Sequence, residues 1–184
     1  MGDRHIEYVP VDELVAAPKN PKTHALDQLQ ASMLRFQFTE PCLIDERTGR
    51  LVAGHGRVEA LREAQAAGLD APDGVQVKNG VWLVPVVRGW ASTSDEEASA
   101  YVIASNRLTE VGGWNDAELA DVLTDLAALP DGLVGVGYSD DDLAGFLAMV
   151  RSPDFRPASE DEQPRLDIRN PTICPNCGHQ FHKG

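Results

Sequence analysis

The chain has little of several features that would define a protein class. Three of its 184 residues are cysteine (Cys42, Cys174 and Cys177), an odd number too small for a disulfide framework. Sixteen lysines and arginines stand against 29 aspartates and glutamates, a formal charge of −13, which excludes binding to DNA by bulk positive charge. No apolar run approaches the roughly 20 residues that span a bilayer, and the N-terminus lacks the apolar core of a signal peptide. These absences predict a cytoplasmic protein with no membrane partner.

The overall composition indicates a folded protein. Hydrophobic residues make up 42% and charged residues 24%, which is typical of a globular domain, and the length suffices for one such domain and a tail. Residues 115–142 hold eight acids and no lysine or arginine, whereas the first 62 residues hold eight basic and nine acidic residues. An anion-binding site is therefore expected in the N-terminal half.

Apolar spacing and turn residues predict an α+β fold, with a mixed α/β front and a helical back. Strands are expected at 6–11, 41–45, 51–53 and 81–87, with a hairpin between the second and third, a loop at 69–80, and Pro85 favouring an edge. Helices are expected at 25–36, 57–67, 95–108, 115–129 and 139–150, capped at three of these starts by Thr23, by Asn115 or Asp116, and by Ser139. The predicted parts are a domain over 5–110, a helical extension over 111–151, a linker over 152–171 and a tail over 172–184.

The sharpest motif is the turn Gly54-His55-Gly56-Arg57 between a strand and a helix. A helix N-terminus offers free N–H groups and partial positive charge to a phosphate, and glycine lets the backbone approach an anion. His55 and Arg57 add side-chain donors. The motif predicts a phosphate-binding turn. The alternative is a tight turn that needs glycine for its backbone alone.

Two polar segments are candidates for the same pocket. The loop from Pro18 to His24 includes Asn20 and Lys22, which could reach a phosphate or a base; the alternative is a solvated loop. Asn106 and Arg107 end the helix over 95–108 and could face the turn. Arg107 also suits the negative end of the helix dipole without any ligand.

The tail CPNCGHQFHKG contains a zinc-knuckle pattern. Cys174 and Cys177 can bind one tetrahedral Zn²⁺, and His179 and His182 are the local candidates for the remaining ligands. These histidines are closer together than the usual spacing, which argues against four ligands from one segment. A knuckle from a second chain could complete the site and give a homo-oligomer through the tail. Otherwise the two thiols are free.

In this order the motifs resemble the ParB/sulfiredoxin-like superfamily, in particular the short ParB-like proteins of phages and prophages. The resemblance covers about residues 5–150 and is carried by Asn20-Pro21-Lys22, Phe38 to Ile44, Leu51 to Arg57, Val84 to Val87, Ala104 to Leu108 and Gly113-Trp114-Asn115. The tail resembles the CPxCGHxF ending of some of these proteins. The resemblance implies a compact domain over 5–110 with a small sheet and flanking helices, in the cytoplasm of a bacterial host.

The resemblance also implies roles for residues that the motifs single out. The phosphate-binding turn of the family matches Gly54, His55, Gly56 and Arg57, its N-terminal loop motif Asn20 and Lys22, and its third motif Asn106, beside Arg107. Family members bind CTP, ATP or ADP, usually with Mg²⁺. Some hydrolyse the nucleotide, some cut DNA and some transfer a phosphate.

Departures from the family pattern limit what carries over. The turn is GHGR where partition proteins have GERR, so the acidic residue and a second arginine are absent. Ser105 stands where those proteins have a glutamate, which weakens the case for magnesium. Acidic helices follow instead of a helix-turn-helix domain, which argues against centromere-like DNA clamping. Sulfiredoxin activity needs a catalytic cysteine in the turn, where this chain has His55.

Three functions follow, in descending order. The first is binding of a nucleotide, with hydrolysis by His55 and Arg57 as a further step, in phage or prophage DNA metabolism or gene regulation. The second is a ParB-like nuclease, although the acidic surface makes DNA a weak partner. The third is a non-enzymatic adaptor that docks a partner through the acidic helices and the zinc tail. The sequence leaves open whether the chain is a nucleoside triphosphatase, a nuclease or no enzyme.

Overall fold

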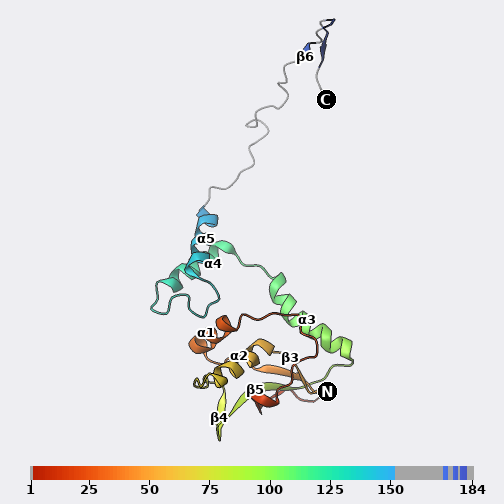
Figure 1. Ribbon diagram of the computed structural model, residues 1–184, viewed down its shortest axis with the longest axis vertical. Coiled ribbons are helices and arrows are strands. Elements are labelled where there is room, and N and C mark those ends of the chain that lie inside the picture. The colour runs from red at the N-terminus through yellow and green to blue at the C-terminus, as the bar shows by residue number, and fades with distance from the viewer. Residues whose placement is uncertain (1, 152–171, 174–175, 178, 182–184) are drawn as a thin grey trace. The chain divides into compact units, whose positions relative to one another are not determined.

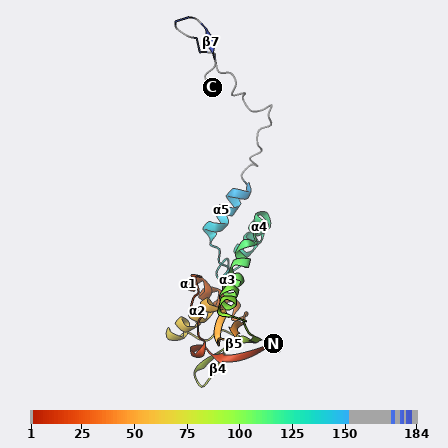
Figure 2. The same ribbon diagram turned by 90° about the vertical axis from the view of Figure 1, so that its right-hand side faces the viewer.

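The computed structural model describes residues 2–151 and, in the tail, residues 172–173, 176–177 and 179–181. The chain divides into two compact units, Met1–Val150 and Arg151–Gly184. The first unit has the expected mixed architecture, a small sheet with flanking helices (Figures 1 and 2). In the second unit, β6 (Thr172–Ile173) pairs antiparallel with β7 (Gln180–Phe181). The predicted linker over 152–171 lies outside the described residues.

The sheet of the first unit has five strands in the order β1-β5-β2-β3, with β4 also paired to β5. Its strands are β1 (His5–Pro10), β2 (Cys42–Asp45), β3 (Arg50–Ala53), β4 (Gln76–Lys78) and β5 (Val81–Trp90). The expected hairpin of β2 and β3 is confirmed, and β1 lies at an edge as Pro10 requires. β5 runs antiparallel to β1 and parallel to β2.

Two predictions about this sheet are wrong. The segment 69–80 is not all loop, because β4 turns back on β5 through Asn79 and Gly80, both with positive φ (53° and 78°). The strand over 81–87 is not an edge strand, because β5 has β1 on one side and β2 on the other. Pro85 is tolerated because pairing with β2 begins one residue later, at Val86, so the missing N–H lies before that ladder.

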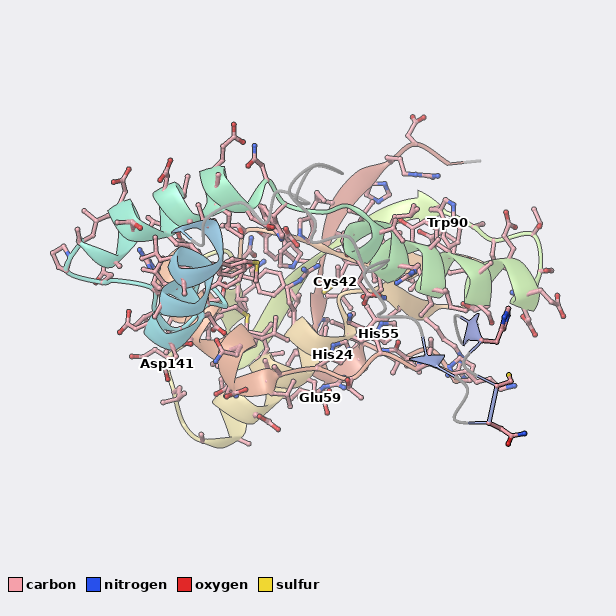
Figure 3. The ribbon with its side chains drawn as sticks, turned by 90° about the horizontal axis from the view of Figure 1, so that it is seen from above. His24, Cys42, His55, Glu59, Trp90 and Asp141 are labelled. Carbon is pink, nitrogen blue, oxygen red and sulfur yellow. The ribbon has the colours of Figure 1, made fainter. Side chains whose placement is uncertain are left out.

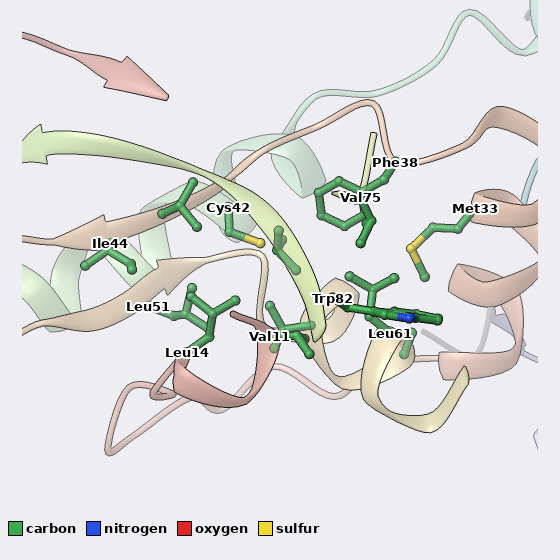
Figure 4. Packing of buried hydrophobic residues seen from close by; sticks show 14 residues of the cluster. Val11, Leu14, Met33, Phe38, Cys42, Ile44, Leu51, Leu61, Val75 and Trp82 are labelled. Carbon is green, nitrogen blue, oxygen red and sulfur yellow. The ribbon is translucent and has the colours of Figure 1, made fainter. Parts of the chain in front are cut away.

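The main core lies between the sheet and two neighbouring helices, α1 (Leu26–Phe36) and α2 (His55–Ala66). Figure 4 shows it built from Val11, Leu14, Met33, Phe38, Cys42, Ile44, Leu51, Leu61, Val75 and Trp82. The first of these belongs to a 3-10 turn, η1 (Val11–Glu13), where one helical turn was expected. Thr23 is not the N-cap of α1, because the helix starts at Leu26 and its cap position falls on Ala25.

The three helices after the sheet begin at the polar caps that their sequence favours. In α3 (Asp95–Val111), which ends three residues later than expected, the Ser94 side chain accepts from Glu97 N. The predicted caps of α4 (Asp116–Ala127) and α5 (Asp140–Arg151) are confirmed, because Asn115 Oδ1 accepts from Glu118 N and Ser139 Oγ accepts from Asp142 N.

α4 and α5 form a second, smaller core. Leu119 and Leu123 of α4 pack with Leu133 and with Leu143 of α5. Arg35 at the end of α1 donates to the carbonyls of residues 132 and 134, at 2.9 and 2.7 Å, which joins the loop between α4 and α5 to α1. Among the helices of residues 2–151, none is long and apolar enough to cross a membrane.

Candidate functional site

The predicted turn joins β3 to α2, and its first glycine is required by the backbone. Gly54 has φ 93° and occupies the N-cap position of α2. A Cβ atom at this position would lie 2.6 Å from the Cys42 Sγ atom, far inside van der Waals contact. The left-handed φ and this close approach both exclude a side chain at position 54.

The N-terminus of α2 is left without a side-chain cap. Gly54 has no side chain to accept from the first turn, and the first backbone bond of the helix runs from Val58 N to Gly54 O at 3.0 Å. The amides of residues 55–57 precede that bond, where helices have no internal acceptors. These N–H groups and the positive end of the helix dipole can bind an anion.

Arg57 extends from the first turn of α2 and is held by one exposed carboxylate. Its guanidinium lies 2.6 Å from Glu40 Oε2, and it donates to Pro41 O at 3.4 Å. The Arg57 side chain is 25% exposed, whereas that of Glu40 is 74% exposed. The Arg57 Nε is buried and has no acceptor within reach in the described chain. The guanidinium is thus near the turn and is not saturated by protein groups.

The His55 ring is engaged by the backbone on both sides. Its Nε2 accepts from Ala17 N at 3.2 Å, so a neutral ring carries its proton on Nδ1. Burial and the nearby charge of His24 lower the pKa of His55, and a hydrogen bond with the Leu51 backbone only partly offsets them. A neutral His55 therefore fastens the incoming loop to the end of β3.

The loop before α1 brings its predicted polar residues together. Lys22 N donates to Asn20 Oδ1 at 3.3 Å, and the Asn20 amide nitrogen lies 3.3 Å from His24 Nε2. Figure 3 shows His24 and His55 near one another in the middle of the first unit. The Lys22 ammonium pairs with Glu110 of α3 at 2.5 Å. The loop is thus tied to both α2 and α3.

The two candidate residues on α3 are engaged within their own helix. Asn106 Nδ2 donates to Val102 O at 2.8 Å, and Arg107, 64% exposed, lies 3.4 Å from Glu110. Glu110 therefore links Arg107 to Lys22 of the loop. The predicted nucleotide contacts of Asn106 and Arg107 stay predictions.

Three residues near the site were not singled out from the sequence. Glu40 and Glu110 neutralise Arg57 and Lys22, and Cys42 lies directly under Gly54, with its Sγ 3.9 Å from Gly54 O. Burial raises the pKa of Cys42 to about 11, although the Arg57 charge opposes the shift. The thiol is therefore protonated at neutral pH and serves as packing under the turn.

A cavity of about 770 Å³ adjoins this region between the loop, β3 and α3. Its lining is largely apolar, with Val52, Val102 and Ile103 among the walls and Lys19 and Arg50 at its rim. Ala17 also lines it, and the same residue donates to His55 in the turn. A cavity of this size suits a small organic ligand.

The metal predictions fall differently on the two units. In the described part of the chain, no three His, Cys, Asp or Glu side chains are grouped to hold a metal ion, so the residues present do not fit a protein-bound Mg²⁺. In the tail, Cys177 and His179 are exposed, while Cys174 and His182 lie outside the described residues. The zinc site stays a prediction.

Comparison with solved structures places this architecture among known folds. The C-terminally truncated chromosome-partitioning protein ParB from Caulobacter crescentus, complexed with CTP-γ-S, matches with a TM-score of 0.54 and 21% identity, over 82% of this chain and 81% of that chain. The fold is ParB-like. A Pnob8-like ParB-N domain matches at a TM-score of 0.41 and 15% identity, over 82% of this chain and 63% of that one. No protein-family model and no curated protein matches the chain.

Proposed function

We propose that the chain binds a nucleoside di- or triphosphate with the phosphates at the Gly54–Arg57 turn. The observation that carries the proposal is the uncapped N-terminus of α2, which combines free amides with an incompletely bonded arginine three residues in. The ParB-like fold supports it, since the similar ParB structure holds a CTP analogue. CTP is therefore the first candidate, and ATP and ADP are the alternatives.

The residues of the site divide into contacts and supports. The amides of residues 55–57 and the Arg57 guanidinium contact the phosphates, and Lys22 approaches from the loop once it leaves Glu110. His55 holds the loop in place through its Nε2. The nucleoside extends into the adjoining cavity. Any Mg²⁺ arrives on the nucleotide, and no step here runs through it.

Calorimetric titration with CTP, ATP, GTP and ADP, each with Mg²⁺, tests this function. We expect micromolar affinity for one of them and a loss of at least tenfold in Arg57→Ala, because hydrogen bonds to charged groups contribute about 1.5–3 kcal/mol. Arg88→Ala is the matched control, since Arg88 is similarly exposed (28%) and also pairs with carboxylates. The proposal is wrong if none of the four binds, or if both variants bind like the wild type.

Glu40→Gln is expected to tighten nucleotide binding about two- to fivefold. Glu40 occupies the Arg57 guanidinium at 2.6 Å, and a phosphate has to compete with its charge. The gain is modest because exposed ion pairs contribute about 0.2–1 kcal/mol. Glu59→Gln, an exposed α2 carboxylate labelled in Figure 3, controls for the general change in charge. Weaker binding in Glu40→Gln alone would show that Glu40 positions Arg57 instead of competing for it.

Hydrolysis is the proposed further step, within phage or prophage DNA metabolism or gene regulation. Release of inorganic phosphate from the bound nucleotide would support it. Cutting of DNA and docking of a partner rank lower, because the site residues described here fit a phosphate and the surface is acidic.

A further inference from the structure

We propose that His24 contacts the nucleotide phosphates, and that position 56 is glycine because the His24 imidazole occupies the space of its side chain. The inference rests on the proposed nucleotide binding and adds a ligand-contacting residue to that site. It starts from a glycine that the backbone does not require.

Gly56 lies inside α2, and its φ is not among the positive ones. At such a position alanine is more favourable than glycine by about 1 kcal/mol, so the residue needs another explanation. A Cβ atom there would lie 2.7 Å from both Cγ and Nδ1 of His24, and 2.8 Å from Leu29 Cδ1. Space for neighbouring side chains, and not backbone conformation, therefore accounts for this glycine.

The His24 ring is oriented by the loop from which it comes. The Asn20 amide nitrogen is a donor, so at 3.3 Å it donates to His24 Nε2, and Asn20 is itself held through Lys22 N. With Nε2 accepting, the proton of a neutral ring is on Nδ1. Nδ1 is also one of the two His24 atoms nearest to Gly56. The ring thus brings an N–H donor to the first turn of α2, beside the amides that have no internal acceptor.

His55 and His24 have different tasks in this arrangement. His55 uses Nε2 to accept from the Ala17 backbone. The charge of His24 nevertheless influences His55, which confirms that the two imidazoles are close. The imidazole with a donor available to an anion is His24.

The test measures the affinity of His24→Ala, Gly56→Ala and the double variant for whichever of the four nucleotides the wild type binds best. Each single change is expected to lower the affinity about tenfold, as loss of a hydrogen bond to a charged group does. The double variant is expected to be no weaker than the singles, because both remove one contact. Gly145→Ala, in a helix of the same unit where a Cβ meets nothing within 4 Å, is the control for a helical glycine.

Two further measurements separate contact from packing. Leu29→Ala is expected to keep wild-type affinity, which excludes Leu29 as the cause of the Gly56→Ala effect. The His24 ring resonances are expected to move on addition of nucleotide to the wild type, and not in Gly56→Ala. His24→Ala with wild-type affinity, or single losses that multiply in the double variant, would overturn the inference while leaving nucleotide binding intact. A wild type that binds no nucleotide would remove the proposed function first, and this inference with it.

Discussion

Gly54→Ala is expected to lower the free energy of unfolding by about 2–5 kcal/mol and to abolish nucleotide binding. A non-glycine residue at a left-handed φ costs about 1–2 kcal/mol. The added methyl would also lie 2.6 Å from Cys42 Sγ, and such overpacking of a buried position costs about 1–3 kcal/mol. Relief of that contact moves the turn, and with it the amides that face the phosphate. Urea unfolding and calorimetry measure the two effects.

Gly49 provides the matched control for this prediction. It too has a left-handed φ (67°), but a Cβ there would meet nothing within 4 Å. Gly49→Ala should therefore show the conformational cost alone and keep nucleotide affinity. Adding Cys42→Ala to Gly54→Ala removes the sulfur from the contact and should recover part of the lost stability. Equal effects of the two glycine substitutions would mean that Cys42 does not constrain the turn.

Asp45→Ala is expected to destabilise the domain by about 3–5 kcal/mol, because it removes a fully buried charge on which several donors converge. Asp45 Oδ1 accepts from Ser92 N at 2.8 Å and Arg47 N at 3.1 Å, and Oδ2 accepts from Ser92 Oγ at 2.8 Å and Thr48 Oγ1 at 2.9 Å. These bonds hold the β2–β3 turn to the segment that leads into α3. Thermal unfolding measures the loss, with Asp121→Ala, an exposed carboxylate of α4, as control.

The same carboxylate gives a pH dependence of known sign. Burial alone would raise the pKa of Asp45, but the hydrogen bonds from Ser92, Thr48 and Arg47 outweigh it and lower the pKa. A carboxyl with a lowered pKa in the folded state stabilises above its unfolded-state value and loses that contribution as the pH falls through the folded-state value. The stability difference between wild type and Asp45→Asn should therefore shrink as the pH falls below 3.8. A difference independent of pH down to 3 would contradict this account.

Local sequence patterns predicted most of the sheet and helices, because alternation, helical spacing and caps act over a few residues. The caps at Asn115 and Ser139 are examples. The missed strand β4 had a local sign too, since Asn79-Gly80 is a strong hairpin signal. Pro85 misled for the opposite reason. Whether a proline fits inside a sheet depends on where the neighbouring strand starts to pair, which is a tertiary property.

At the site, the sequence predicted what glycine spacing controls and missed what distant carboxylates control. The turn and its helix follow from Gly54 and Gly56. Glu40 and Glu110 are 17 and 88 residues from the cations that they pair with, and no local pattern connects them. The packing of Cys42 under Gly54 and of His24 on Gly56 depends in the same way on the tertiary fold.

The most direct test of the central claim is to follow the backbone amide resonances by ¹H–¹⁵N NMR during titration with CTP, or with whichever nucleotide calorimetry selects. The account predicts that the largest shifts fall on the amides of His55, Gly56 and Arg57, with smaller shifts in the loop over 17–24. Binding with shifts centred elsewhere, such as on α4, α5 or the tail, would contradict the assignment of the phosphate site to the turn.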